Sequence, residues 1–106
     1  LEPAALAAHL AGADLLLNTS AAGLKGESFD GFPWEALNPA AAVYDMVYLR
    51  RGRTSFLATA AGCGHRVADG LGMLACQGEE SFDLWTGQRP PSGVRRARLR
   101  AECAEI

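Results

Sequence analysis

Two glycines and one amide side chain, within residues 68–77, have the types and the spacing expected of a ligand-binding turn. Gly70 and Gly72 lack a Cβ atom, so a ligand or a second backbone segment can approach the chain closely there. Apolar residues recur at helical spacing from Leu71 onward, which predicts a glycine turn that leads into a helix. Gln77 lies off that apolar stripe, and its amide both donates and accepts hydrogen bonds, which suits a polyhydroxylated ligand. Spacing alone favours the alternative, a solvated glutamine on an amphipathic helix.

Two apolar segments precede this stretch, and each is predicted to be a strand. Ala13 to Leu17 is predicted to be a short buried strand, because its three successive leucines, rather than an alternating pattern, are typical of a parallel strand covered on both faces, and a loop rich in Ser, Gly and Ala follows it. Ala42 to Tyr48 is the second strand, with Met46 and Tyr48 at its carboxyl end. Ligands of open parallel sheets bind outside the carboxyl ends of the strands, so both places are candidates for ligand contact. The alternatives are an ordinary connection for the loop, and core packing for Met46 and Tyr48.

Three motifs occur in order along residues 13–100. They are Asn18-Thr19-Ser20-Ala21-Ala22-Gly23, then Tyr44-Asp45-Met46-Val47-Tyr48 with Thr54-Ser55-Phe56-Leu57, and then Asp69-Gly70-Leu71-Gly72-Met73-Leu74 with Gln77 and Leu84-Trp85-Thr86-Gly87. In order and spacing they resemble the C-terminal part of the shikimate dehydrogenase family. Three ordered motifs are far more specific together than any one of them.

The resemblance implies a function and a set of site residues. Members of this family reduce 3-dehydroshikimate reversibly to shikimate, a step toward chorismate and the aromatic amino acids, with NADP as the cofactor. Carried over position by position, it implies that Met46, Gly70 and Ser20 lie beside the nicotinamide nucleotide. Tyr48 and Gln77 would contact the substrate hydroxyls. At position 19 the family has Ala and at position 20 it has Thr, so the hydroxyl is kept at Ser20 although the packing differs.

We expect an α/β fold, a partial Rossmann-like parallel sheet of about three strands near residues 14–18, 43–48 and 65–68, with flanking helices. The predicted helices are Pro3 to Leu10, a helix capped by Thr54 that runs to about Ala61, Leu71 to Trp85, and a basic C-terminal helix from Ser92. The resemblance implies that residues 1–106 form the C-terminal portion of an NADP-binding domain. The glycine-rich phosphate-binding turn and the N-terminal catalytic domain are then expected outside this chain, because no G-x-G-x-x-G motif is present.

The chain supplies no catalytic candidate and no metal site. Its only lysine, Lys25, lies in a loop and matches no motif, and the three cysteines form no C-x-x-C pair. A formal net charge of −2 argues against nucleic acid as a partner, and no apolar run approaches the roughly 20 residues that cross a bilayer. The three cysteines are widely spaced and odd in number, which fits a reducing cytoplasm. We therefore expect a cytoplasmic protein that acts on a small molecule.

Two alternatives to an NADP-dependent shikimate dehydrogenase stay open. One is a related dehydrogenase that acts on quinate or uses NAD, because the segment that selects the 2′-phosphate of NADP is absent from the chain. The other is an α/β module without enzymatic activity, kept as a binding or assembly domain. Under the enzymatic interpretation, the isolated chain is expected to be inactive.

Overall fold

The computed structural model describes residues 2–25, 28–91, 97–99 and 101 of the chain. One sheet contains three short parallel strands in the order β1-β2-β3, namely β1 (Leu15–Asn18), β2 (Ala42–Asp45) and β3 (Val67–Asp69). The predicted α/β class, the number of strands and their parallel pairing are confirmed.

Two strand boundaries differ from the prediction. The second strand ends at Asp45 rather than at Tyr48, because the Asp45 carboxylate accepts a hydrogen bond from the backbone N–H of Val47 and turns the chain there. The third strand begins at Val67 rather than at His65. The backbone N–H of His65 donates to the carbonyl oxygen of Ala60, so this residue belongs to the end of the preceding helix.

The helical elements described beside the sheet are α1 (Pro3–Ala11), the 3-10 turn η1 (Trp34–Ala36), α2 (Ser55–Gly62) and α3 (Leu71–Thr86). The predicted cap of α2 is confirmed, since the Thr54 hydroxyl accepts the backbone N–H of Leu57 at 3.3 Å. Gly87 ends α3 in the left-handed conformation at φ +69°, as its position after the helix predicts. Of the predicted C-terminal helix, residues 97–99 and 101 are helical, and the rest lies outside the described residues.

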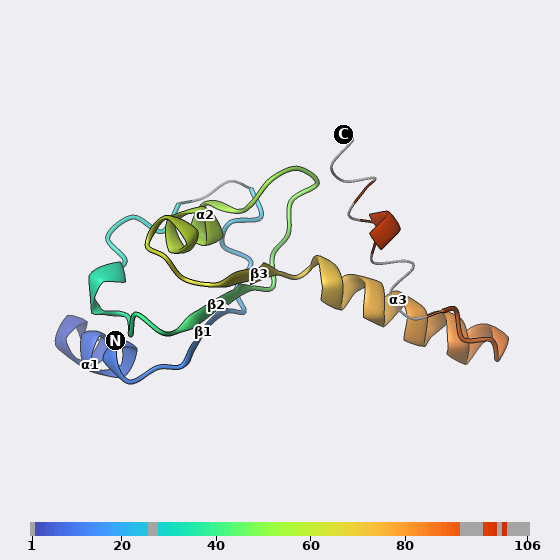
Figure 1. Ribbon diagram of the computed structural model, residues 1–106, viewed down its shortest axis with the longest axis horizontal. Coiled ribbons are helices and arrows are strands. Elements are labelled where there is room, and N and C mark those ends of the chain that lie inside the picture. Colours follow the sequence, from blue (N-terminus) through green and yellow to red (C-terminus); the bar gives the residue numbers. More distant parts are fainter. Residues whose placement is uncertain (1, 26–27, 92–96, 100, 102–106) are drawn as a thin grey trace.

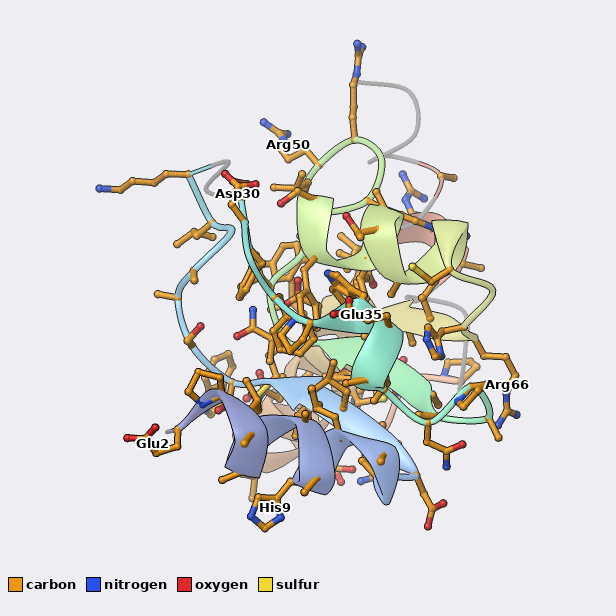
Figure 2. All side chains as sticks on the ribbon, turned by 90° about the vertical axis from the view of Figure 1, so that its left-hand side faces the viewer. Glu2, His9, Asp30, Glu35, Arg50 and Arg66 are labelled. Atoms are coloured by element: carbon orange, nitrogen blue, oxygen red, sulfur yellow. The ribbon has the colours of Figure 1, made fainter. Side chains whose placement is uncertain are left out.

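One face of the sheet packs against α2 and the long connection between β1 and β2 (Figure 1). Val43 of β2 meets Leu57 of α2 in this core, and the ring of Phe56 lies 5.1 Å from that of Trp34 in the connection. Trp34 therefore anchors this connection to the core. Figure 2 shows this core between α2 and α1, with charged residues such as Glu2 and Arg66 at the periphery.

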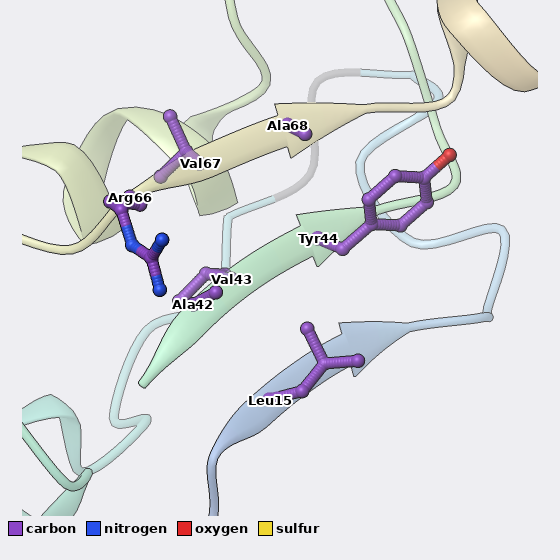
Figure 3. A pocket seen from close by; sticks show the side chains of 7 residues that line it. All are labelled: Leu15, Ala42, Val43, Tyr44, Arg66, Val67 and Ala68. Carbon is purple, nitrogen blue, oxygen red and sulfur yellow. The ribbon is translucent and has the colours of Figure 1, made fainter. Parts of the chain in front are cut away.

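The described residues leave the opposite face of the sheet uncovered. Leu15 and Leu17 of β1 point to this face and are 56% and 44% exposed, and Tyr44 of β2 lies beside them half-buried. Leu15 and Tyr44 border a shallow hollow of about 190 Å³, along which Figure 3 shows Leu15, Tyr44 and Arg66. Parallel sheets are almost always covered on both faces, so an apolar uncovered face calls for a second layer.

Helix α3 projects away from the sheet (Figure 1). Only Leu71 and Ala75, in its first turns, are buried, whereas Leu84 and Trp85 are 85% and 82% exposed. Only the first turns of its apolar stripe therefore pack against the described part of the chain. No helix among the described residues is long and apolar enough to cross a membrane.

Candidate functional site

The carboxyl ends of the three strands place polar residues in one row. Asn18 ends β1, Asp45 ends β2 and Asp69 ends β3, and the strand register pairs Asn18 with Asp45 and Asp45 with Asp69. This edge is the place where open parallel sheets bind ligands. The predicted ligand contacts follow these residues in the chain. Ser20 comes after Asn18, Met46 comes after Asp45, and Gly70 comes after Asp69.

Asp45 is completely buried and accepts three hydrogen bonds. Its Oδ1 accepts the side-chain amide of Asn18 and the backbone N–H of Val47, both at 3.0 Å. Its Oδ2 accepts the hydroxyl of Thr54 at 2.7 Å, and Thr54 is 1% exposed. Burial of a carboxylate is costly unless its oxygens are hydrogen-bonded, so these three donors explain how an acidic residue is kept in the core.

Asn18 links this carboxylate to the loop after β1. The Asn18 amide donates to the carbonyl oxygen of Ala22 as well as to Asp45, and its Oδ1 accepts both the backbone N–H and the hydroxyl of Ser20, the latter at 2.6 Å. Ser20 is exposed, and its hydroxyl oxygen also accepts the backbone N–H of Ala22. The hydroxyl predicted to face a cofactor therefore also holds the loop in a fixed turn at the edge of the sheet.

Gly70 is buried directly after β3, where it packs against the backbone of Met46. A Cβ atom at position 70 would clash with the carbonyl oxygen of Met46 and would lie 2.8 Å from its carbonyl carbon. Met46 itself is 37% exposed. The structure therefore brings together Met46 and Gly70, two of the three predicted cofactor contacts, and the absence of a side chain at position 70 permits this approach.

The two predicted substrate contacts follow this pair along the chain, Tyr48 after Met46 and Gln77 after Gly70. Tyr48 follows Met46 by two residues and is half-buried, and Gln77 is exposed on α3. Seven residues separate Gly70 from Gln77, which places them on the same helical face about 10 Å apart along the axis. Gln77 is thus separated from Met46 and Gly70 by two helical turns, with its amide accessible to a ligand.

The described residues offer little else for catalysis. None of their His, Cys, Asp and Glu side chains gather in a group of three or more that could hold a metal ion. Lys25 lies in an exposed loop, as do the arginines that follow Tyr48. At the far end of α3, hydrogen bonds and charge attraction from Glu80, and then from Asp83, raise the pKa of the exposed Arg89 guanidinium.

Asp45 and Thr54 appeared in the sequence motifs without a functional assignment. The alternation of β2 places Asp45 on the same face as the apolar Val43, which was the available signal. A charged residue on a core face must find hydrogen-bond donors. Which donors it finds depends on Asn18 and Thr54, 27 and 9 residues away in sequence.

The sequence of this chain is similar to those of shikimate dehydrogenases. Residues 70–100 match the family model of the shikimate 5′-dehydrogenase C-terminal domain. Over 88 residues, or 83% of the chain, the sequence is 51% identical to a protein of Geobacter sulfurreducens named shikimate dehydrogenase (NADP(+)). That match covers 30% of the Geobacter protein, so the chain spans about a third of the length of the curated relatives it matches.

The fold of this chain is also similar to those of solved shikimate dehydrogenase structures. The chain superposes with a TM-score of 0.73, at 35% identity, on a Thermus thermophilus shikimate 5-dehydrogenase in complex with NADP(H) and shikimate. A shikimate 5-dehydrogenase from Listeria monocytogenes, in complex with shikimate and NAD, gives a TM-score of 0.75 at 28% identity. These superpositions cover 92% and 91% of this chain, and 36% and 34% of the respective structures.

Proposed function

This chain belongs to the shikimate dehydrogenase family, and we propose that it is the C-terminal portion of the dinucleotide-binding domain of an NADP-dependent shikimate dehydrogenase. The complete enzyme would interconvert 3-dehydroshikimate and shikimate on the route to chorismate and the aromatic amino acids. The observation that carries the proposal is the 51% identity to a relative named shikimate dehydrogenase (NADP(+)), over most of this chain.

The structure supports an incomplete domain through its open sheet face. Leu15, Leu17 and Tyr44 form an apolar surface on a parallel sheet, and such sheets are buried on both sides. The curated relatives are about three times longer than the matched region, so they contain enough additional chain for a second layer and for a catalytic domain. In this proposal residues 1–106 form one part of the cofactor-binding domain.

The carboxyl edge of the sheet then forms one wall of the active site. Met46 and Gly70 border the nicotinamide, and the missing Cβ at position 70 lets the backbone of Met46 lie directly against Gly70. Ser20 lies on the same edge, at the nucleotide side. NADP, when bound, accepts a hydride from the alcohol carbon of shikimate or, as NADPH, returns one to the ketone of 3-dehydroshikimate.

Tyr48 and Gln77 hold and orient the substrate from this wall. The Tyr48 hydroxyl and the Gln77 amide donate and accept hydrogen bonds, and a small ring with several hydroxyls is oriented by a few such contacts. The proton released from the alcohol oxygen passes to a group of the N-terminal catalytic domain, because no residue of this chain is assigned as its acid or base. That domain is the principal partner we propose.

A second cofactor assignment has a specific observation in its favour. The Listeria structure that superposes on this chain contains NAD together with shikimate. An enzyme that uses NAD, or one that also accepts quinate, could have the same residues at this edge of the sheet. The contacts proposed above are to the nicotinamide and the substrate, and none is to the 2′-phosphate that distinguishes NADP from NAD.

We also propose a cytoplasmic location. Cys63 is a free, exposed thiol, as is usual in a reducing compartment.

The experiment is a steady-state assay of the complete protein that contains this chain. The purified protein is given shikimate or quinate, each with NADP or NAD, and formation of the reduced nicotinamide is followed by its absorbance. We expect the highest kcat/KM for shikimate with NADP. A higher kcat/KM with NAD or with quinate would favour the second assignment, and a protein inactive with all four combinations would contradict the proposal.

A further inference from the structure

We propose that Asp45 is a positioning residue. Its buried carboxylate fixes the proposed cofactor contacts, Ser20 and Met46, relative to the proposed substrate contact Tyr48. This inference rests on the proposed function. It concerns a residue that is assigned no contact with the nucleotide or the substrate. The geometry that supports it is the convergence of three chain segments on one carboxylate at the carboxyl edge of the sheet.

The first segment is the stretch that carries Met46 and Tyr48. The backbone N–H of Val47 lies between these two residues and donates to Asp45 Oδ1 at 3.0 Å. This hydrogen bond ends β2 and sets the direction in which the chain leaves the sheet. Met46 and Tyr48 flank Val47, so their backbone orientation depends directly on the Asp45 carboxylate.

The second segment is the loop after β1. Asn18 donates its amide to the same Oδ1 atom and accepts the hydroxyl of Ser20, and Asn18 is itself 8% exposed. Ser20 is therefore connected to the end of β2 through a single side chain. A displacement of the Asp45 carboxylate would move the Ser20 loop together with the Met46 backbone.

The third segment is the N-terminus of α2. Thr54 donates its hydroxyl to Asp45 Oδ2 at 2.7 Å and accepts the backbone N–H of Leu57. Thr54 and Asp45 are both almost fully buried, and α2 packs through Leu57 into the core. This hydrogen bond fixes the carboxylate relative to α2, so that Asp45 can act as a common anchor for the ends of β1 and β2.

Every buried polar side-chain atom of the network around Asp45 has a hydrogen-bond partner. No buried side-chain nitrogen or oxygen of the described residues lacks a hydrogen-bond partner. Satisfied buried networks specify one arrangement of their members, whereas removal of one member leaves the others unpaired. A small shift at this edge is then transmitted to the contact between Met46 and Gly70, where the backbone has no free space.

The test compares four variants of the complete protein. Asp45→Ala removes all three acceptor contacts, whereas Asp45→Asn keeps the shape and an oxygen for Asn18 and Val47. Thr54→Val keeps the volume but deletes the hydroxyl that donates to Asp45. The matched control is Val43→Ala, which lies on the same face of the same strand, is 1% exposed, and makes no side-chain hydrogen bond.

We expect Asp45→Ala and Thr54→Val to lower kcat/KM for shikimate about tenfold or more, at a temperature at which every variant is folded. Asp45→Asn should remain within about threefold of the unmodified protein. Val43→Ala should lower the melting temperature with nearly unchanged kcat and KM. If Val43→Ala and the Asp45 and Thr54 variants lose kcat/KM in proportion to their loss of melting temperature, the positioning role is overturned.

A second readout does not depend on activity. Amide hydrogen exchange should become faster in Asp45→Ala at residues 20–22 and 46–48, and much less so in Val43→Ala. If Asp45→Ala does not fold, Thr54→Val carries the same comparison. A wild-type protein without turnover would contradict the proposed function. The comparison of amide hydrogen exchange at these residues would still test the positioning role of Asp45. Equal exchange in the Asp45 or Thr54 variant and in the control would overturn it.

Discussion

Gly70 lies against the backbone of Met46 so closely that a Cβ atom at position 70 would be 2.8 Å from the Met46 carbonyl carbon. The contact joins the residue after β3 to the residue after β2, at the edge where all three strands end. Since Gly70 has φ −75°, a conformation open to any residue, glycine is required here by space and not by backbone dihedral.

The first prediction follows from this contact. Gly70→Ala should lower the free energy of unfolding of the complete protein by about 1–3 kcal/mol, the usual cost of overpacking, because backbone cannot move aside as a flexible side chain can. It should also raise the KM for NADP. Thermal unfolding and steady-state kinetics measure the two effects.

The matched control for Gly70→Ala is Gly78→Ala on α3. A Cβ atom at position 78 meets nothing within 4 Å, so alanine should leave stability unchanged or raise it by roughly 0.5–1 kcal/mol, as expected for glycine inside a helix. Equal effects of the two substitutions would show that the approach to Met46 imposes no constraint.

The second prediction concerns Gln77, the exposed amide on α3. Gln77→Ala in the complete enzyme should lower kcat/KM for shikimate roughly tenfold or more, because lost hydrogen bonds to substrate hydroxyls of about 1.4 kcal/mol correspond to that factor. The KM for NADP should change little. Gln88→Ala, an exposed glutamine beyond the end of α3, is the control and should leave both constants unchanged. Unchanged shikimate kinetics, or a defect confined to NADP, would remove Gln77 from the site.

The third prediction tests whether the open sheet face is covered in the complete protein. Leu17→Glu should lower the free energy of unfolding there by about 2 kcal/mol or more, since a covered leucine contributes that much and a buried carboxylate adds a further cost. The control Leu24→Glu, at a 60% exposed loop position, should have little effect. Chemical denaturation provides the measurement, and similar values for both variants would argue against a second layer on this face.

The fourth prediction is that residues 1–106 alone neither oxidise shikimate nor reduce 3-dehydroshikimate. The proposed acid–base groups and the phosphate-binding turn belong to the rest of the protein, so the isolated wall has neither a complete cofactor site nor a proton acceptor. The complete protein, assayed in parallel, is the positive control. Turnover by the isolated chain above a buffer blank would contradict the division into domains proposed here.

The sequence by itself determined the class of the fold and the places where its helices begin. Apolar runs, a threonine cap before α2 and a glycine stop after α3 are local signals, because each depends on residues only a few positions apart. The resemblance in three motifs supplied the proposed contacts Ser20, Met46, Tyr48, Gly70 and Gln77. Their roles stay predictions, although the structure places Ser20, Met46 and Gly70 on one edge.

Only the tertiary structure decided where β2 ends and what Asp45 does. Asp45 ends β2 by accepting the backbone N–H of Val47, and its carboxylate is held in place by Asn18 and Thr54, which become its neighbours only when β1, β2 and α2 are assembled. The space required by Gly70 is likewise set by Met46, 24 positions earlier in the chain, and no local pattern encodes that contact. Long-range pairing and packing have no periodicity along the sequence, and for this reason they emerged only from the folded chain.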